Sequence, residues 1–298
     1  MIAEAADAAC AGQTHPAATL YIVATPIGNL ADLTLRAIHV LGLVDAVACE
    51  DTRVTGALLS RLGLHKPLMA VHEHNEREAA AGVIERLARG ERVAYVSDAG
   101  TPAVSDPGAA LVAAVRGAGR ACMPIPGASS VVAALSAAGD AQARGFAFIG
   151  FLPTKAGERD AALVALARRD GESLVLFEAP HRILAVADAL AAAMPERRLT
   201  IARELTKRFE EIATLAARDA PAWLAADAQR VRGEFVLVLH ALPAASAGDA
   251  TLEDGAERTL RALLAELPLK QAVALAAAAT GAARNALYER ALALRGDD

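Results

Sequence analysis

Cysteine and aromatic side chains are scarce in this sequence. Its 298 residues include 3 Cys, and aromatic residues make up 3% of the chain. Cys10, Cys49 and Cys122 are an odd number without Cys-x-x-Cys spacing, which argues against a disulfide framework and against a structural zinc site. We therefore predict no metal centre and a reducing, cytoplasmic location.

Long hydrophobic runs are also missing. A membrane span requires roughly 20 apolar residues, and runs such as 131–135 and 273–279 are much shorter. Residues 1–18 contain Glu4 and Asp7 but no Lys or Arg, so they lack the basic start of a secretory signal or of an Arg-rich transit peptide. We predict a protein without membrane contact and a disordered tail over residues 1–18.

Neither sign of charge is in large excess. The chain has 30 Lys and Arg against 35 Asp and Glu, a net charge of −5. This balance does not by itself indicate a nucleic-acid-binding protein, so any RNA contact depends on where the cations lie. What the chain does have is alanine, about a quarter of all residues, and a length that suggests two compact domains.

The pattern of apolar residues predicts an α/β fold. From residue 20 onward, short β-branched runs alternate with helical stretches, which is typical of strands joined by helical crossovers in a largely parallel sheet. In the first half we expect strands at 20–24, 46–48, 93–96 and 121–125, with helices at 33–41, 52–62, 77–89 and 107–118. These elements predict an N-terminal α/β domain over residues 19–140.

The second half repeats the alternation with one difference. We expect strands at 145–150, 173–177, 199–202 and 233–240, with helices at 157–168, 183–194 and 220–228. Hairpin-like spacing near 209–215 predicts a mixed rather than a purely parallel sheet in a second α/β domain over residues 141–243. A stretch rich in Ala, Ser, Gly and Asp then predicts a linker, followed by a small helical unit over 251–298 with helices at 252–267, 270–279 and 284–294.

Loops that follow the strands carry the strongest functional signal, because ligands of open parallel sheets bind beyond the carboxyl ends of the strands. Residues 25–30, Thr-Pro-Ile-Gly-Asn-Leu, are not the Gly-x-Gly-x-x-Gly fingerprint of a dinucleotide site. Residues 97–108 contain two Gly, two Pro and two Asp, and twelve residues are more than a turn needs. We interpret this segment as a loop that binds a small polar ligand, with 125–130 beside it.

Charged residues follow other strands. They lie in the segments 50–53, 150–155, 177–182 and 202–208. A run of charge is usually a solvated face, but three such segments at strand ends in the second half, opposite the loops of the first half, indicate a cleft between the domains.

Six segments in order resemble the ribosomal RNA small subunit methyltransferase I family, within the tetrapyrrole methylase superfamily. They are 25–30, 50–53, 97–108, 150–155, 178–182 and 203–207. The resemblance covers residues 19–242 and includes a short helical tail similar to 269–294. It implies two α/β domains of tetrapyrrole-methylase type with S-adenosylmethionine in the cleft between them. It also implies a homodimer that 2′-O-methylates a cytidine in the decoding region of 16S ribosomal RNA in the small ribosomal subunit.

The resemblance also implies cofactor-binding residues. The chain departs from the superfamily's Gly-rich first loop by having Thr-Pro-Ile-Gly at 25–28, which favours the RNA enzyme over small-molecule methylases. The residues expected at the cofactor are Thr25, Pro26, Gly28, Gly100, Thr101, Val104, Ser129, Ser130 and Phe177, with 233–235 completing the adenosine pocket.

Methyl transfer to a hydroxyl is an in-line displacement that needs alignment, exclusion of water and removal of a proton. The candidates for the base, which the sequence does not rank, are Glu50, Asp51, Glu178, His181 and Glu204. The cations expected to hold RNA phosphates are Arg53, Lys155, Arg182, Arg203, Lys207 and Arg208. The C-terminal unit carries Lys270, Arg284, Arg290 and Arg295, and either a helix-turn-helix-like nucleic-acid contact or a helical cap or dimer element fits it.

Two other functions compete with this interpretation. A methylase of a small tetrapyrrole-like molecule on the same fold predicts an apolar cleft with few cations. A non-catalytic RNA-binding protein of ribosome assembly needs no cofactor pocket, and it would leave the loop 97–108 unexplained.

Overall fold

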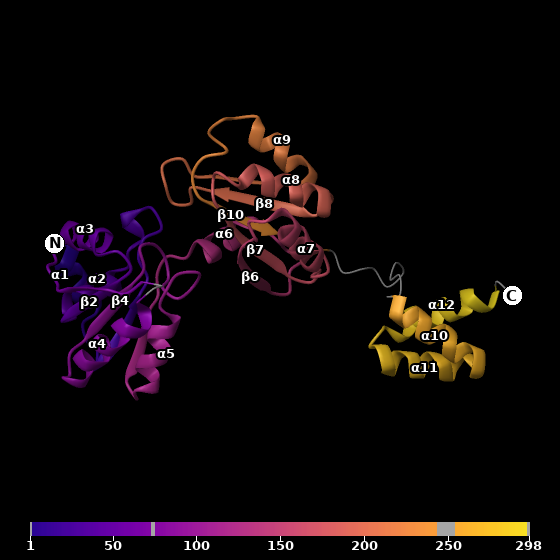
Figure 1. Cartoon of the computed structure of the whole chain (residues 1–298), viewed down its shortest axis with the longest axis horizontal. Coiled ribbons are helices and arrows are strands. Elements are labelled where there is room, and N and C mark those ends of the chain that lie inside the picture. Colours follow the sequence, from indigo (N-terminus) through magenta and orange to yellow (C-terminus); the bar gives the residue numbers. More distant parts are fainter. Residues whose placement is uncertain (1, 73–74, 243–253, 297–298) are drawn as a thin grey trace. The chain divides into compact units, whose positions relative to one another are not determined.

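Two compact units make up the chain, residues 1–241 and residues 242–298. The computed structural model describes residues 2–72, 75–242 and 254–296 (Figure 1). Among the residues described, the first unit contains two five-stranded sheets and the second contains three helices. Among the described residues, no helix combines the length and the apolar character that a bilayer crossing requires.

The first sheet is parallel throughout, with the strand order β3-β2-β4-β1-β5. Its strands are β1 (Thr19–Val23), β2 (Ala46–Cys49), β3 (Leu68–Ala70), β4 (Val93–Val96) and β5 (Ala121–Ile125). All residues of β2 and β4 are buried, because helices cover both faces of such a sheet and its central strands read as continuous apolar runs. The predicted parallel sheet is confirmed.

Helices connect these strands as the sequence predicts. They are the 3₁₀ turn η1 (Leu30–Asp32) and the helices α2 (Leu35–Leu43), α3 (Thr52–Arg61), α4 (Glu76–Ala88) and α5 (Ala109–Gly117). Side chains begin two of them: Thr34 caps α2 by accepting from the Ala37 amide, and Asp51 caps α3 by accepting from the Arg53 amide. The sequence missed β3, an edge strand of three residues.

The second sheet is mixed, as the hairpin signal predicts. Its order is β6-β7-β10-β8-β9, with β6 parallel to β7 and the other pairs antiparallel. The strands are β6 (Phe146–Phe151), β7 (Ser173–Glu178), β8 (Arg198–Arg203), β9 (Glu211–Ala216) and β10 (Phe235–Leu239). The helices α7 (Ala156–Ala167), α8 (Ile183–Ala193) and α9 (Ala220–Ala225), with the turn η2 (Ala217–Asp219), accompany them. The fully buried β10 lies at the centre.

Helix α6 (Ser130–Ala138) belongs to the core of the second sheet. Its buried Val131, Ala134 and Ala138 share one apolar cluster with Val175 of β7 and Val236 of β10, among others. The sequence places this helix in a domain ending at residue 140, whereas its apolar face is covered by strands that come later in the chain.

The first eighteen residues are not the disordered tail that their composition suggests. Residues Ile2–Ala9 form helix α1, whose Ala6 is buried in the core of the first sheet with α2. Asp7 lies 2.7 Å from Nδ1 of His39 on α2. Apart from the exposed Ile2, this alanine-rich segment has no large apolar side chain to signal burial, so its docking depends on a small contact that periodicity does not reveal.

The C-terminal unit has its own small core. Helices α10 (Asp254–Glu266), α11 (Leu269–Thr280) and α12 (Arg284–Gly296) bury Leu260, Val273 and Leu287 between them. The three predicted helices are therefore confirmed where they are described. Most of the predicted linker, residues 243–253, lies outside the described residues.

Candidate functional site

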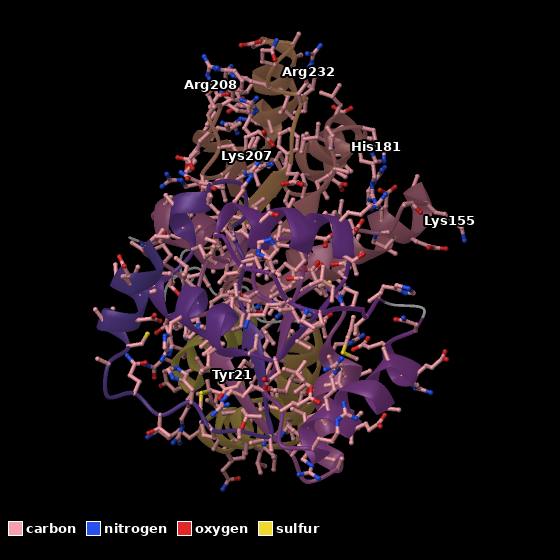
Figure 2. The ribbon with its side chains drawn as sticks, turned by 90° about the vertical axis from the view of Figure 1, so that its left-hand side faces the viewer. Tyr21, Lys155, His181, Lys207, Arg208 and Arg232 are labelled. Atoms are coloured by element: carbon pink, nitrogen blue, oxygen red, sulfur yellow. The ribbon has the colours of Figure 1, made fainter. Side chains whose placement is uncertain are left out.

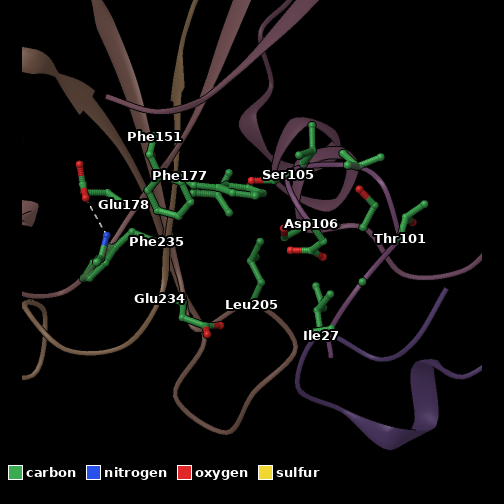
Figure 3. Close-up of a pocket in the computed structure, with 18 of the residues that line it drawn as sticks. Ile27, Thr101, Ser105, Asp106, Phe151, Phe177, Glu178, Leu205, Glu234 and Phe235 are labelled. Atoms are coloured by element: carbon green, nitrogen blue, oxygen red, sulfur yellow. Dashed lines mark hydrogen bonds between the residues drawn. The ribbon is translucent and has the colours of Figure 1, made fainter. Parts of the chain in front are cut away.

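A cavity of about 480 Å³ lies between loops of the first sheet and loops of the second (Figure 3). The first sheet contributes residues from the segment 99–106 and Ile27, and the second contributes Phe177, Leu205 and Phe235 among others. Ser129 and Ser130 line it at the start of α6. The cavity therefore forms where the sequence predicts a cleft, at the carboxyl ends of the parallel strands.

The loop 97–108 is held in a strained conformation. Ala103 and Ser105 have φ angles of 64° and 71°, although neither is glycine, and such angles persist only where the surroundings enforce them. The amides of Gly108 and Leu111 both donate to Oε1 of Glu76, at 2.9 and 2.8 Å. These bonds fix the end of the loop at the start of α5.

A backbone bridge fixes the beginning of the same loop. The Thr25 amide donates to the Gly100 carbonyl at 2.9 Å, and the Gly100 amide donates to the Thr25 carbonyl at 3.1 Å. The hydroxyl of Thr101 donates to the Ala128 carbonyl at 3.0 Å. The loop is thus tied to the segments that follow β1 and β5.

Acidic side chains and no cations line the cavity. Its described lining residues include Asp106, Glu178 and Glu234, but no Lys, Arg or His. Glu178 is almost fully buried, its Oε1 accepts from the Ala179 amide at 2.8 Å, and Nε of Arg182 lies 3.2 Å away. Its Oε2 is buried and has no hydrogen-bond partner. A buried acceptor without a partner is costly, so this carboxylate depends on its contacts with the Ala179 amide and Arg182.

Asp106 is the second acidic group of this wall. Burial, together with the negative charge of Glu50, raises the pKa of Asp106 to about 6. The carboxylate points into the cavity beside Ile27 and Leu205 (Figure 3). No Lys, Arg or His forms an ion pair with it within the described ranges. The sequence pattern points to the loop 97–108 but not to this residue.

Comparisons with known proteins agree over almost the whole chain. Residues 19–221 match the tetrapyrrole (corrin/porphyrin) methylases, and residues 249–295 match the RsmI C-terminal HTH domain. Proteins named ribosomal RNA small subunit methyltransferase I are 50% identical over 92% of this chain and 93% of their own length in Neisseria meningitidis serogroup B. In Pseudomonas aeruginosa the identity is 48% over 94% and 99%.

The chain belongs to the ribosomal RNA small subunit methyltransferase I family. Solved structures support the fold of this family. A uroporphyrin-III C-methyltransferase from Thermus thermophilus matches with a TM-score of 0.54 at 24% identity, over 75% of this chain and 94% of its own. The cobalt precorrin-4 methyltransferase CbiF matches with a TM-score of 0.55 at 18% identity, over 74% and 94%. The predicted two-sheet arrangement is that of the tetrapyrrole methylases.

Six of the nine residues expected at the cofactor line the cavity of this family member. They are Gly100, Thr101, Val104, Ser129, Ser130 and Phe177. The other three do not: Thr25 is buried and donates its hydroxyl to the Ser97 carbonyl at 3.1 Å, and Gly28 lies against the side chain of Lys207. Between them, Ile27 reaches the cavity instead of Pro26, a difference of one position that depends on the backbone turn.

Only one of the five candidate bases, Glu178, lines the cavity. Asp51 pairs with Arg53, which lowers the pKa of the Asp51 carboxyl to about 2. Glu204 binds Nζ of Lys207 at 2.9 Å and the Glu234 amide at 3.0 Å. Glu50 and His181 lie outside the lining as well.

Most of the cations expected to hold RNA already have acidic partners. Arg53 pairs with Asp51, Lys155 with Glu158, Arg182 with Glu178, Arg203 with Glu211, and Lys207 with both Glu204 and Glu234. Arg203 is also buried, and its guanidinium donates to the carbonyls of Phe209 at 3.1 Å and Arg232 at 3.4 Å. It therefore holds two loops together.

Arg208 and Arg232 differ from these cations because their side chains are exposed and no described carboxylate pairs with them. Arg208 lies over the ring of Phe209, 5.4 Å from its centroid, and Phe209 is 64% exposed. Figure 2 shows Arg208 and Arg232 at the outer end of this part of the molecule, with Lys207 farther in. We call Arg208, Phe209 and Arg232 the arginine-aromatic patch.

The ion pair of Arg182 with Glu178 predicts a large effect on stability. Arg182→Met leaves the buried carboxylate without its cation and removes the 2.7 Å bond to the Leu152 carbonyl. We expect the free energy of unfolding in urea at pH 7 to fall by about 3 kcal/mol. Lys155→Met is the matched control, because its pair with Glu158 is exposed and should change stability by less than about 1 kcal/mol. Equal effects would contradict the assigned structural role.

Proposed function

We propose that the cavity binds S-adenosylmethionine and that the protein transfers its methyl group to the ribose 2′-oxygen of a cytidine in the decoding region of 16S ribosomal RNA. The observation that carries the cofactor assignment is the charge of the cavity wall. Three carboxylates and no described cation line it; Arg182 and Lys207 pair with two of them from outside the lining, and Asp106 has no described ion-pair partner. S-adenosylmethionine carries a sulfonium and an ammonium against one carboxylate, so its net positive charge matches this wall, whereas the phosphates of a dinucleotide would be repelled.

The other lining residues also fit this ligand. Ile27, Phe177, Leu205 and Phe235 provide apolar surface for an adenine ring, while Ser129 and Ser130 provide hydroxyls. A Thermus thermophilus uroporphyrin-III C-methyltransferase with this fold, at a TM-score of 0.53 and 20% identity, was solved with S-adenosyl homocysteine.

The RNA substrate is supported by the names of the relatives, which are ribosomal RNA methyltransferases over nearly the full chain. When bound, the cofactor supplies an activated methyl group. The protein has to align the acceptor oxygen, exclude water and accept a proton, because a ribose hydroxyl is a weak nucleophile. Action on the small subunit, a cytoplasmic location and a homodimer are further parts of this proposal.

Among the cations, the arginine-aromatic patch is the surface we propose for RNA. Its guanidinium groups lack acidic partners, and an exposed aromatic ring offers a platform on which a base can stack. The resemblance assigns Arg203 and Lys207 to RNA. Their hydrogen bonds instead hold the loops that carry this surface. Arg53, Lys155 and Arg182 stay secondary candidates, because each has an acidic partner.

The cofactor site predicts a difference between two exposed phenylalanines of one strand. Phe146 and Phe151 lie at opposite ends of strand β6 and are 53% and 54% exposed. Of these two, Phe151 lines the cavity and Phe146 does not. Phe151→Ala should weaken S-adenosylmethionine binding in calorimetry about tenfold, near 1.4 kcal/mol, through lost apolar contact. Phe146→Ala should leave the affinity unchanged. Equal affinities for both variants and the wild type would place the cofactor elsewhere.

The RNA surface predicts a change in salt dependence. Arg208→Ala and Arg232→Ala should each reduce the slope of log K for RNA binding against log salt by about one unit, while cofactor affinity is preserved. Arg218→Ala is the control, because this exposed arginine is paired with Glu196 and should leave the slope unchanged. Unaltered slopes in both patch variants would mean that RNA binds at another surface, and the C-terminal helices would be tested next.

The reaction itself is tested by its product. A 2′-O-methyl group blocks the nucleophile of alkaline cleavage, so methylated subunits should yield one alkali-resistant step at a cytidine after incubation with enzyme and S-adenosylmethionine. A base-methylated nucleoside in mass spectrometry, without that step, would refute the ribose assignment. No product under conditions where the cofactor binds would favour a small-molecule methylase, and absence of cofactor binding would favour a non-catalytic RNA-binding protein.

A further inference from the structure

Among the three carboxylates that line the cavity, Asp106 is distinguished by its lack of an ion-pair partner. Arg182 lies beside Glu178, and Nζ of Lys207 binds Glu234 at 2.8 Å. Within the described residues, Asp106 has no such cation. A carboxylate paired with a cation is a poor proton acceptor, because the cation stabilises its charged form. Asp106 is therefore the lining carboxylate with the chemistry of a base.

The position of Asp106 is fixed by the strained loop that carries it. Ser105, directly before it, has a φ of 71°, and the Ala103 amide donates to the Pro107 carbonyl at 3.2 Å across it. Beyond it, Gly108 packs so closely on Tyr95 that an added Cβ would lie 2.3 Å from the ring. Strain of this kind is maintained where the surroundings overdetermine the backbone, and it is concentrated at functional sites. The loop presents the carboxylate to the cavity in one orientation.

Other acidic groups surround Asp106 and set its basicity. Glu50 after β2 and Asp98 after β4 both raise its pKa through their negative charge, while the nearby Ser97 hydroxyl acts in the opposite direction. The buried Tyr95 phenol lies in the same field, and burial together with Glu76, Glu50 and Asp106 raises its pKa well above the usual range. Desolvation is the largest cause that raises the pKa of Asp106 to about 6. The group is thus ionised near neutral pH yet more basic than an ordinary aspartate.

We propose that Asp106 is the general base of the methyl transfer, which rests on the function proposed above. The acceptor 2′-oxygen forms its bond to the methyl carbon as the bond from that carbon to sulfur breaks, with the electron pair staying on sulfur. The hydroxyl proton moves to a carboxylate oxygen of Asp106 and passes to water after product release. Glu178, whose charge Arg182 compensates, takes no part in this proton transfer.

The first test measures the rate of methyl transfer to small subunits that lack the modification. Asp106→Asn keeps the size of the side chain but removes the base, so we expect the single-turnover rate to fall by about 10²–10⁴. Because Asp106 also contributes negative charge to the cavity wall, the rate is measured at saturating S-adenosylmethionine and small subunits, where weaker binding cannot account for the loss. Glu178→Gln should instead weaken cofactor binding. A rate within about threefold of the wild type in Asp106→Asn would overturn the proposal.

The second test uses the acid limb of the pH profile. The wild-type rate should fall as pH decreases through about 6, where Asp106 becomes protonated. Asp98→Asn removes one neighbouring negative charge and can still accept the 3.1 Å bond from the Asp51 amide. It should therefore move the acid limb to lower pH without lowering the plateau at pH 8. An acid limb that does not move in this variant would contradict the proposal.

A third readout is independent of methyl transfer. The folded-state pKa of Asp106 is raised, so the folded protein holds this proton more tightly than the unfolded chain, and its stability falls as pH rises through about 6. Asp106→Asn should therefore stabilise the fold more at pH 8 than at pH 5. If the wild type does not methylate RNA but this pH difference appears, the proposed function fails. If the wild type is active and Asp106→Asn is equally active, only the assignment of the base fails.

Discussion

The pairing of two backbone segments between Thr25 and Gly100 is the constraint on which the site depends. Two reciprocal hydrogen bonds join the loop after β1 to the loop after β4. They direct Ile27 into the cavity and hold Gly28 beneath the stem of Lys207, where an added Cβ would lie 2.4 Å from a side-chain carbon. Because Gly100 has a φ of 85° and Gly28 a φ of 156°, both positions require glycine.

Charged side chains occur in two different settings in this protein. The cavity is lined by the carboxylates of Asp106, Glu178 and Glu234 together with apolar side chains. Outside, the arginines divide into those that bind carbonyls and carboxylates of the protein, such as Arg203, and those that are left to solvent, such as Arg208 and Arg232. Under the proposed function, a cationic cofactor and a polyanion would therefore meet different surfaces of the protein.

The sequence predicted most strands and the loop expected to bind a ligand better than the direction of side chains. Buried parallel strands such as β2 and β4 are continuous apolar runs, and the loop 97–108 was identified by its length and composition. Which side chain of that loop faces the cavity depends on the φ angles of Ala103 and Ser105, which no composition encodes. Asp106 was therefore missed, and Pro26 was named where Ile27 lines the wall.

The sequence also did not show which carboxylates and carbonyls each arginine contacts. Arg203 and Arg208 are five positions apart and look alike in the sequence, but Arg203 ends a buried strand and finds Glu211 and two carbonyls through the tertiary fold. The short edge strand β3 and the small-residue helix α1 were missed for a related reason. Each is stabilised by contacts with distant segments rather than by a strong local pattern.

The packing of α6 has a consequence for how this protein can be divided. Val131, Ala134 and Ala138 find their cover on β7, β8 and β10, so a fragment ending near residue 140 would expose that apolar face to water. A fragment beginning after it would leave the same face of the second sheet bare. Residues 1–241 should therefore melt as one cooperative body, and neither half would be a module that evolution or engineering could exchange alone.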